Sequence, residues 1–122
     1  MTKILLVEDE MALQKTLSDY LKTTGYEVIN AFDGQKGLEL AEKEIPNLIL
    51  LDLILPKMDG FEVLNKLKEN PNTENIPIIV LTNLEDLPSI EKVLKKNIKA
   101  YLVKADYSLE EVVEKIKEAL KT

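Results

Sequence analysis

The stretch Leu48-Ile49-Leu50-Leu51-Asp52-Leu53-Ile54-Leu55-Pro56-Lys57-Met58-Asp59-Gly60 decides the fold of this chain. Large aliphatic side chains run directly into Asp52, and Pro56 and the Asp59-Gly60 pair then turn the chain. A short apolar run bounded by turn residues is typical of a central strand in a parallel sheet, buried on both faces. We therefore expect Asp52 at the carboxyl end of that strand, the edge where open α/β sheets bind their ligands.

Outward from this strand, segments with strand character alternate with segments of helical spacing. The expected strands cover residues 4–7, 26–31, 48–51, 78–81 and 100–103. Leu13, Leu17 and Leu21 have helical spacing after the first strand, and a capping box of Ser108 and Glu111 starts the last helix. This alternation predicts right-handed βαβ units and an α/β sheet covered on both faces. Because the sequence contains no linker, repeat or low-complexity segment, we expect one domain over residues 1–122.

Composition argues against several classes of function. The chain of 122 residues has a formal net charge of −6, which disfavours nucleic-acid binding through a broad basic face. It has no cysteine and no histidine, so thiolate and imidazole metal sites are excluded. No apolar stretch approaches the roughly 20 residues of a membrane helix, and no signal-peptide pattern precedes the first strand. We expect a cytoplasmic protein that binds neither nucleic acid directly nor a membrane.

Polar side chains follow four of the expected strands. Glu8 and Asp9 come after the first strand, Asp52 after the third, Thr82 after the fourth and Lys104 after the fifth. Because parallel strands point the same way, these side chains should converge at one edge of the sheet. Carboxylates crowded there would raise one another's pKa unless a cation lay between them, and oxygen ligands suit a hard ion such as Mg²⁺. A carboxylate nucleophile, a divalent metal, an ammonium and a hydroxyl together indicate a phosphoryl-transfer site, with Asp52 as the acceptor.

Four motifs lie in order along the chain with the spacing of a known family. They are Leu-Val-Glu-Asp-Glu (6–10), Leu-Asp-Leu-Ile-Leu-Pro-Lys-Met-Asp-Gly (51–60), Val-Leu-Thr (80–82) and Tyr-Leu-Val-Lys (101–104). Over essentially its whole length, the chain resembles CheY-like receiver domains of two-component response regulators. The resemblance implies a flavodoxin-like doubly wound (βα)5 fold with a five-stranded parallel sheet in the order 2-1-3-4-5. It also implies a single receiver domain over residues 1–122 with no output domain.

The resemblance assigns a metal site. It implies Asp52 as the phosphoacceptor, and it implies that Asp9, Asp52 and the backbone carbonyl of Ile54 bind Mg²⁺. Glu8 would act on the ion through water. A plainer interpretation of Glu8 and Asp9, that they cap the following helix, also stands.

The resemblance likewise assigns a switch. Thr82 and Lys104 would contact the phosphoryl oxygens, and Tyr101 would swing inward when Thr82 shifts. Phosphorylation would thereby bias an equilibrium between an inactive and an active form. Tyr101 could instead be a tyrosine half-buried on an edge strand, and Asp59-Gly60 could be no more than a turn.

Partners follow from the same resemblance and from composition. Because the chain has no histidine, it cannot supply its own phosphohistidine, so a histidine kinase, a phosphotransfer protein or a small phosphodonor is required. A downstream protein target would bind the last two helices and the last strand, and a homodimer is also consistent. We expect no enzyme beyond self-catalysed phosphotransfer and autodephosphorylation.

Two positions depart from the family pattern. Ala105 follows Lys104 where receivers usually have proline in a cis peptide bond, and a cis bond before a non-proline residue costs about 2.5–4 kcal/mol. The reach of Lys104 is therefore an open question. Asn83 follows Thr82 where a small residue is usual, and its amide could slow an attacking water. We expect a long-lived phosphorylated form.

Three rival functions come from other classes. A haloacid-dehalogenase-type phosphatase needs a second aspartate two residues after the nucleophile, where this chain has Ile54. A flavodoxin-like electron carrier needs a phosphate-binding loop after the first strand, and here that loop is the acidic Glu8-Asp9-Glu10. The third rival is a receiver-like protein-interaction scaffold that is not phosphorylated, and the Ala105 departure keeps it open.

Overall fold

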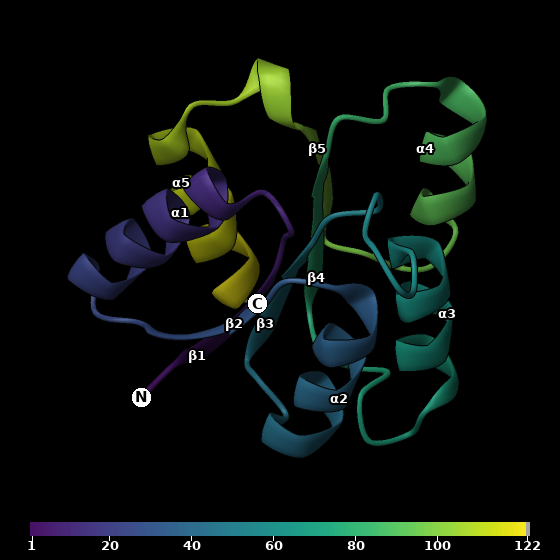
Figure 1. The fold of residues 1–122 in the computed structure, drawn as a ribbon, viewed down its shortest axis with the longest axis horizontal. Helices are drawn as coiled ribbons and strands as arrows, with labels where there is room; N and C mark the ends of the chain where they lie inside the picture. Colours follow the sequence, from purple (N-terminus) through teal and green to yellow (C-terminus); the bar gives the residue numbers. More distant parts are fainter. Residues whose placement is uncertain (122) are drawn as a thin grey trace.

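The computed structural model describes residues 1–121 and forms a five-stranded parallel sheet between two layers of helices (Figure 1). The strands are β1 (Lys3–Val7), β2 (Glu27–Ala31), β3 (Leu48–Leu51), β4 (Ile78–Thr82) and β5 (Ala100–Val103). The helices are α1 (Met11–Thr23), α2 (Gly34–Glu44), α3 (Gly60–Glu69), α4 (Leu87–Leu94), the short 3₁₀ helix η1 (Lys104–Asp106) and α5 (Leu109–Leu120).

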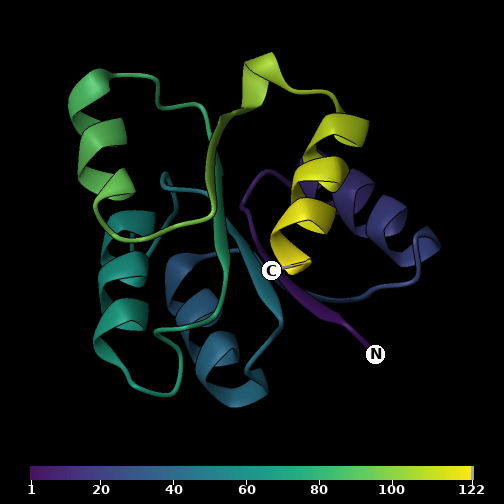
Figure 2. The ribbon, with the colours of Figure 1, turned by 180° about the vertical axis from the view of Figure 1, so that it is seen from behind.

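The sheet has the order β2-β1-β3-β4-β5, with every neighbouring pair parallel. Helices α1 and α5 cover one face, and α2, α3 and α4 cover the other, as the front and back views show (Figures 1 and 2). Each face has its own apolar cluster, and β3 contributes to both because all four of its side chains are buried. The central stretch therefore organises both halves of the core, as its apolar run predicted.

Short-range hydrogen bonds set where the helices begin. The side chains of Asp33, Asp59 and Asp86 each accept a hydrogen bond from the backbone N–H three residues on, at the starts of α2, α3 and α4. Ser108 and Glu111 form the reciprocal capping box predicted for α5. Because such caps satisfy backbone N–H groups that a helix leaves unpaired, local sequence specifies these ends well.

The predicted α/β class, the flavodoxin-like fold and the order 2-1-3-4-5 are confirmed. Three strand boundaries differ from the sequence prediction by one residue: β1 begins at Lys3, Tyr26 precedes β2, and Thr82 is the last residue of β4 rather than the first beyond it. Within residues 1–121, no helix combines the length and the apolar character that crossing a bilayer requires.

Candidate functional site

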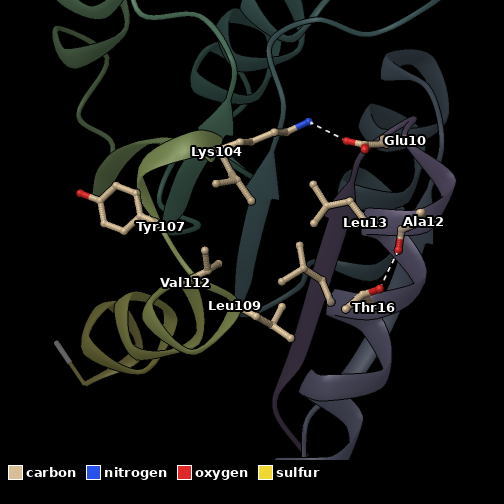
Figure 3. Close-up of a pocket in the computed structure, with 10 residues that line it drawn as sticks. Glu10, Ala12, Leu13, Thr16, Lys104, Tyr107, Leu109 and Val112 are labelled. Carbon is tan, nitrogen blue, oxygen red and sulfur yellow. Dashed lines mark hydrogen bonds and ion pairs between the residues drawn. The ribbon is translucent and has the colours of Figure 1, made fainter.

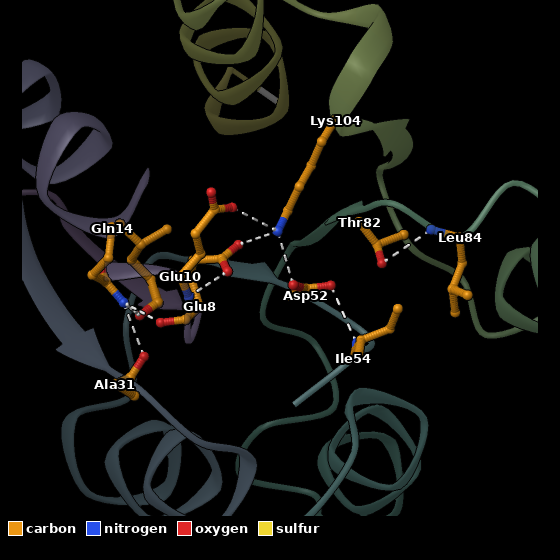
Figure 4. A network of polar contacts seen from close by, with 10 residues as sticks. Glu8, Glu10, Gln14, Ala31, Asp52, Ile54, Thr82, Leu84 and Lys104 are labelled. Atoms are coloured by element: carbon orange, nitrogen blue, oxygen red, sulfur yellow. Dashed lines mark hydrogen bonds and ion pairs between the residues drawn. The ribbon is translucent and has the colours of Figure 1, made fainter. Parts of the chain in front are cut away.

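Strand register brings the predicted polar residues together at the carboxyl edge of the sheet (Figure 4). Glu8 follows β1, Asp52 follows β3, Thr82 ends β4 and Lys104 follows β5. Val7 pairs with Leu51, which sets Glu8 beside Asp52 across two hydrogen-bonded strands. Residues that are up to 96 positions apart in the sequence thus share one small region.

Lys104 lies at the centre of this region. Its Nζ is 2.8 Å from Glu8 Oε1, 3.0 Å from Asp52 Oδ2 and 3.8 Å from Glu10 Oε1 (Figure 4). The peptide bond between Lys104 and Ala105 is trans, as are all peptide bonds within residues 1–121, and the chain turns there through η1. The question raised by Ala105 is therefore answered: the ammonium reaches Asp52 without the usual proline.

Burial controls the electrostatics of Glu8, whose side chain is 3 % exposed. Burial raises the pKa of this carboxyl above its ordinary value, and the nearby Asp52 charge adds to the rise. Hydrogen bonds from Lys104 and from the Glu10 backbone N–H lower the pKa but do not outweigh burial. Desolvation of a carboxylate costs more than one partial ion pair returns here.

Lys104 shows the opposite balance. Burial lowers the pKa of its ammonium, but the hydrogen bonds and charges of Glu8 and Asp52 together outweigh that effect, so the pKa is raised. Lys104 is therefore a firmly protonated internal cation. It offsets the repulsion that two neighbouring buried carboxylates would otherwise have.

Asp52 is 4 % exposed and is held on both sides by backbone. Its Oδ1 accepts a hydrogen bond from the Ile54 N–H at 3.2 Å, and its own N–H donates to the Val7 carbonyl at 3.1 Å. These contacts leave the carboxylate aimed at the cavity between the strand ends. Positioning of this kind suits a nucleophile that must attack along one line.

Gly60 and Asp59 contribute more than a turn, so that sequence interpretation was incomplete. Asp59 caps α3, and a Cβ at Gly60 would collide with the carbonyl oxygen of Asp52. The Gly60 N–H also donates to the Leu53 carbonyl at 2.9 Å. Only a glycine lets the start of α3 approach the backbone that carries Asp52 this closely.

The acidic residues present the donor set of a hard-cation site. One oxygen each from Glu8, Asp9 and Asp52 lies within 4.8 Å of the others. They border a cavity of about 180 Å³ that is lined by Glu8, Asp9, Glu10, Asp52, Ile54, Asn83 and Lys104. Oxygen ligands without nitrogen or sulfur are those that Mg²⁺ prefers, so these residues fit the ion.

The side chains of Thr82 and Tyr101 both contact the backbone of Leu84 rather than Asp52. Thr82 is fully buried, and its Oγ1 accepts a long hydrogen bond of 3.5 Å from the Leu84 N–H. The Tyr101 hydroxyl donates to the Leu84 carbonyl at 2.8 Å. Burial raises the pKa of the Tyr101 hydroxyl, and the charges of Asp86 and Asp52 add to this. Residue 84 thus links the hydroxyl of β4 to the ring of β5.

The helix-capping interpretation of Glu8 and Asp9 is wrong in its simple form. The residue before α1 is Glu10, whose side chain makes no capping hydrogen bond. Glu8 instead accepts from the Glu10 N–H at 2.9 Å through Oε2, while Oε1 faces Lys104. Sequence reasoning did not assign Glu10 a place at the site, although its position beside Glu8-Asp9 was a usable signal.

A second cavity of about 310 Å³ adjoins the acidic one, between α1 and α5 (Figure 3). Its walls are mostly apolar, with Leu13, Leu109 and Val112 among them, and Tyr107 and Thr16 add polar atoms. Glu10 and Lys104 border both cavities. The charged site therefore opens beside an apolar groove rather than onto a uniformly polar surface.

Comparison with known proteins gives a consistent result. A family model described as the response regulator receiver domain matches residues 4–117. The DNA-binding dual master transcriptional regulator RpaA of Synechocystis is 36% identical over 121 residues, covering 99% of this chain and 50% of that protein. The response regulator PleD of Caulobacter vibrioides is 42% identical over 83 residues, covering 68% of this chain and 18% of that protein. The chain spans about half the length of the regulators that it matches end to end.

Solved structures agree with these matches. A CheY-like response regulator receiver domain protein from Methanospirillum hungatei superposes with a TM-score of 0.92 at 32% identity, covering 99% of this chain and 94% of that one. The Mn²⁺-bound form of the response regulator Rcp1 superposes with a TM-score of 0.81 at 33% identity, covering 99% and 91%.

Proposed function

This chain belongs to the response regulator receiver domain family of two-component signalling, and from that premise we propose that Asp52 accepts a phosphoryl group from a phosphohistidine donor. In this transfer an Asp52 carboxylate oxygen forms a bond to phosphorus while the bond between phosphorus and the donor nitrogen breaks. The electron pair of the broken bond stays with the donor imidazole. The product is an acyl phosphate that water later hydrolyses.

Lys104 gives the strongest support, because its Nζ lies 3.0 Å from Asp52 Oδ2 at the edge of the acidic cavity. An ammonium at that place favours the negative charge that a phosphoryl group brings. In a scaffold that is never phosphorylated, burying a lysine between two carboxylates would cost desolvation free energy without serving a function. The trans bond before Ala105 leaves Lys104 in contact with Asp52, so this departure from the family pattern does not support the scaffold alternative.

Asp9, Asp52 and the Ile54 carbonyl would hold Mg²⁺, with Glu8 acting through water. When bound, the ion supplies charge neutralisation for the transferring phosphoryl group. Lys104 would then exchange its contact with the free Asp52 carboxylate for one with the phosphoryl oxygens. Glu8 would keep the ammonium close to the cavity during that exchange.

Thr82 and Tyr101 would change their contacts in response to the added negative charge at Asp52. If the Thr82 hydroxyl turns to donate to a phosphoryl oxygen, its long bond with the Leu84 N–H is lost. Of these two contacts with Leu84, only the bond from Tyr101 to its carbonyl then remains, and the loop before α4 can rearrange. We place the output surface on α4, β5 and α5, where a protein target or a second copy would bind.

A histidine kinase or a phosphotransfer protein would be the donor, and catalysis would be limited to the chain's own phosphorylation and dephosphorylation. Direct binding to nucleic acid is not part of the proposal. A cytoplasmic location remains a prediction of this assignment.

Incubation with Mg²⁺ and acetyl phosphate, followed by intact mass, tests the proposal. We expect the wild type to gain one phosphoryl group and Asp52→Asn to gain none. Asp19→Asn is the matched control, since Asp19 is exposed on α1 and pairs only with Lys15 among the contacts described. A folded wild type that gains no mass with Mg²⁺ present would favour the scaffold instead.

A further inference from the structure

Gln14 on α1 is a buried polar residue that takes no part in the proposed phosphotransfer. Its side chain faces the sheet, and the residue is 2 % exposed. The Nε2 amide donates to the carbonyl oxygens of Leu6, Glu8 and Ala31 at 3.2, 3.0 and 2.9 Å (Figure 4). One amide thus joins the end of β1, the loop after it and the end of β2.

Asn30 fixes which way this amide points. Its Nδ2 donates to Gln14 Oε1 at 2.7 Å from the adjacent strand β2. An amide whose oxygen already accepts a bond must direct its NH₂ group the other way, where its two N–H groups are shared among the three carbonyls. Asn30 on one side and the carbonyls on the other therefore fix the direction of the Gln14 amide.

This network holds Glu8 by its main chain, while Lys104 and Glu10 hold it by its side chain. The Glu8 N–H donates to the Ala31 carbonyl at 3.0 Å, and the Glu8 carbonyl accepts from Gln14. That carbonyl belongs to the peptide that leads into Asp9. The orientation of one peptide plane therefore sets the directions from which both carboxylates reach the cavity.

We propose that Gln14 is a positioning residue that presets the Glu8–Asp9 peptide for binding a divalent cation. This rests on the proposed function, in which Asp9 holds the ion directly and Glu8 through water. Neighbours of a ligand that hold it in its binding geometry change metal affinity when they are removed, typically by 10- to 100-fold. Gln14 acts through the backbone, so the expected effect lies near the lower limit of that range.

Calorimetric titration with MgCl₂ alone tests the inference without relying on phosphorylation. Gln14→Met keeps the length of the side chain and removes its donors, and we expect Mg²⁺ to bind about tenfold more weakly. Asn30→Leu leaves Gln14 in place and removes only the group that orients it, so a smaller weakening is expected.

Thr73→Val is the matched control for a lost buried hydrogen bond. Thr73 is fully buried, and its Oγ1 donates to the Leu67 carbonyl at 2.7 Å, on the α3 side away from the acidic cavity. We expect Thr73→Val to lower the melting temperature and leave the Mg²⁺ dissociation constant unchanged.

Unchanged Mg²⁺ affinity in folded Gln14→Met overturns the inference, and so does an equal weakening in Thr73→Val. If Gln14→Met does not fold, unchanged affinity in Asn30→Leu overturns it. A folded wild type that binds no Mg²⁺ removes both the inference and the metal site of the proposed function. If the wild type binds Mg²⁺ with the same affinity as Gln14→Met, the inference fails and the metal site of the proposed function stands.

Discussion

Two lysines in this molecule make ion pairs of nearly equal length in very different surroundings. Lys15 Nζ lies 3.0 Å from Asp19 Oδ2 on the outer face of α1, and their side chains are 80% and 60% exposed. Lys104 Nζ lies 2.8 Å from Glu8 Oε1, and these side chains are 13% and 3% exposed. Both are ammonium–carboxylate pairs of similar length, so the difference between them is burial. The exposed pair is solvated, whereas the buried pair shapes a site.

The difference has a functional meaning. An exposed pair can exchange its partner for water at little cost, so it constrains nothing around it. At the sheet edge, Glu8 and Asp52 have little water available, and a cation must accompany them. Lys104 is that cation in this structure. A divalent ion, and later a phosphoryl group, would rearrange a balance that already exists.

Replacing each lysine by methionine gives the largest expected contrast. Lys104→Met should lower the free energy of unfolding by about 3 kcal/mol, because it leaves two buried carboxylates without their cation. Lys15→Met should change it by less than about 0.5 kcal/mol. Denaturant titration in the presence of EDTA measures both values.

Adding Mg²⁺ gives a second test of the same two variants, measured again as the free energy of unfolding. Saturating Mg²⁺ should recover stability in Lys104→Met, because an ion that binds only the folded state stabilises it by mass action. It should stabilise Lys15→Met only as much as it does the wild type. Equal losses of stability in the two variants would show that burial does not distinguish the pairs.

Tyr101→Phe tests the contact one step away from the charged cluster. The change removes the bond to the Leu84 carbonyl and should cost about 1 kcal/mol of folding free energy. Tyr107→Phe is the control, because no hydrogen bond of the Tyr107 hydroxyl is found within residues 1–121. Thermal unfolding of both variants provides the measurement. A similar cost in Tyr107→Phe would mean that the ring environment, not the Leu84 bond, is responsible.

Asn83→Ala tests the wall of the acidic cavity, which Asn83 lines together with Asp52. Removing the amide should admit water to the phosphorylated aspartate and speed its hydrolysis about threefold, equivalent to roughly 0.7 kcal/mol in the barrier. The decay of the phosphorylated mass after removal of acetyl phosphate gives the rate. An unchanged or slower decay would contradict a shielding role for Asn83.

The smallest effect concerns an exposed carboxylate at the start of α5. The backbone and side-chain hydrogen bonds with Ser108 lower the pKa of Glu111, so the folded state holds its charged form more strongly than the unfolded chain does. That contribution is present above the ordinary pKa and is lost as pH falls through the lowered one. In acid titrations of stability, Glu111→Gln should lack this small loss. An identical pH profile in both proteins would show that the capping box adds nothing through charge.

Much of the site could be predicted because each polar residue directly follows an apolar run. Strand direction alone predicts that Asp52 and Lys104 lie at one edge of the sheet, and the strand register confirms this placement. The roles of Gly60 and Gln14 were not predicted, since a glycine in a turn and a glutamine on a helix are not part of any distinctive sequence pattern. Their roles depend on what lies across from them: the Asp52 carbonyl in one case and three carbonyl oxygens in the other.

The sequence by itself determined the alternation of strands and helices, the capping box of α5 and the identity of the side chains at the sheet edge. These are local properties, because period, capping and turns depend on residues a few positions apart. Only the tertiary structure decided that the Lys104 ammonium lies between Glu8 and Asp52, and that it does so through a trans bond and the turn η1. Such contacts join residues brought together by strand register and core packing, and both require the whole chain to have folded.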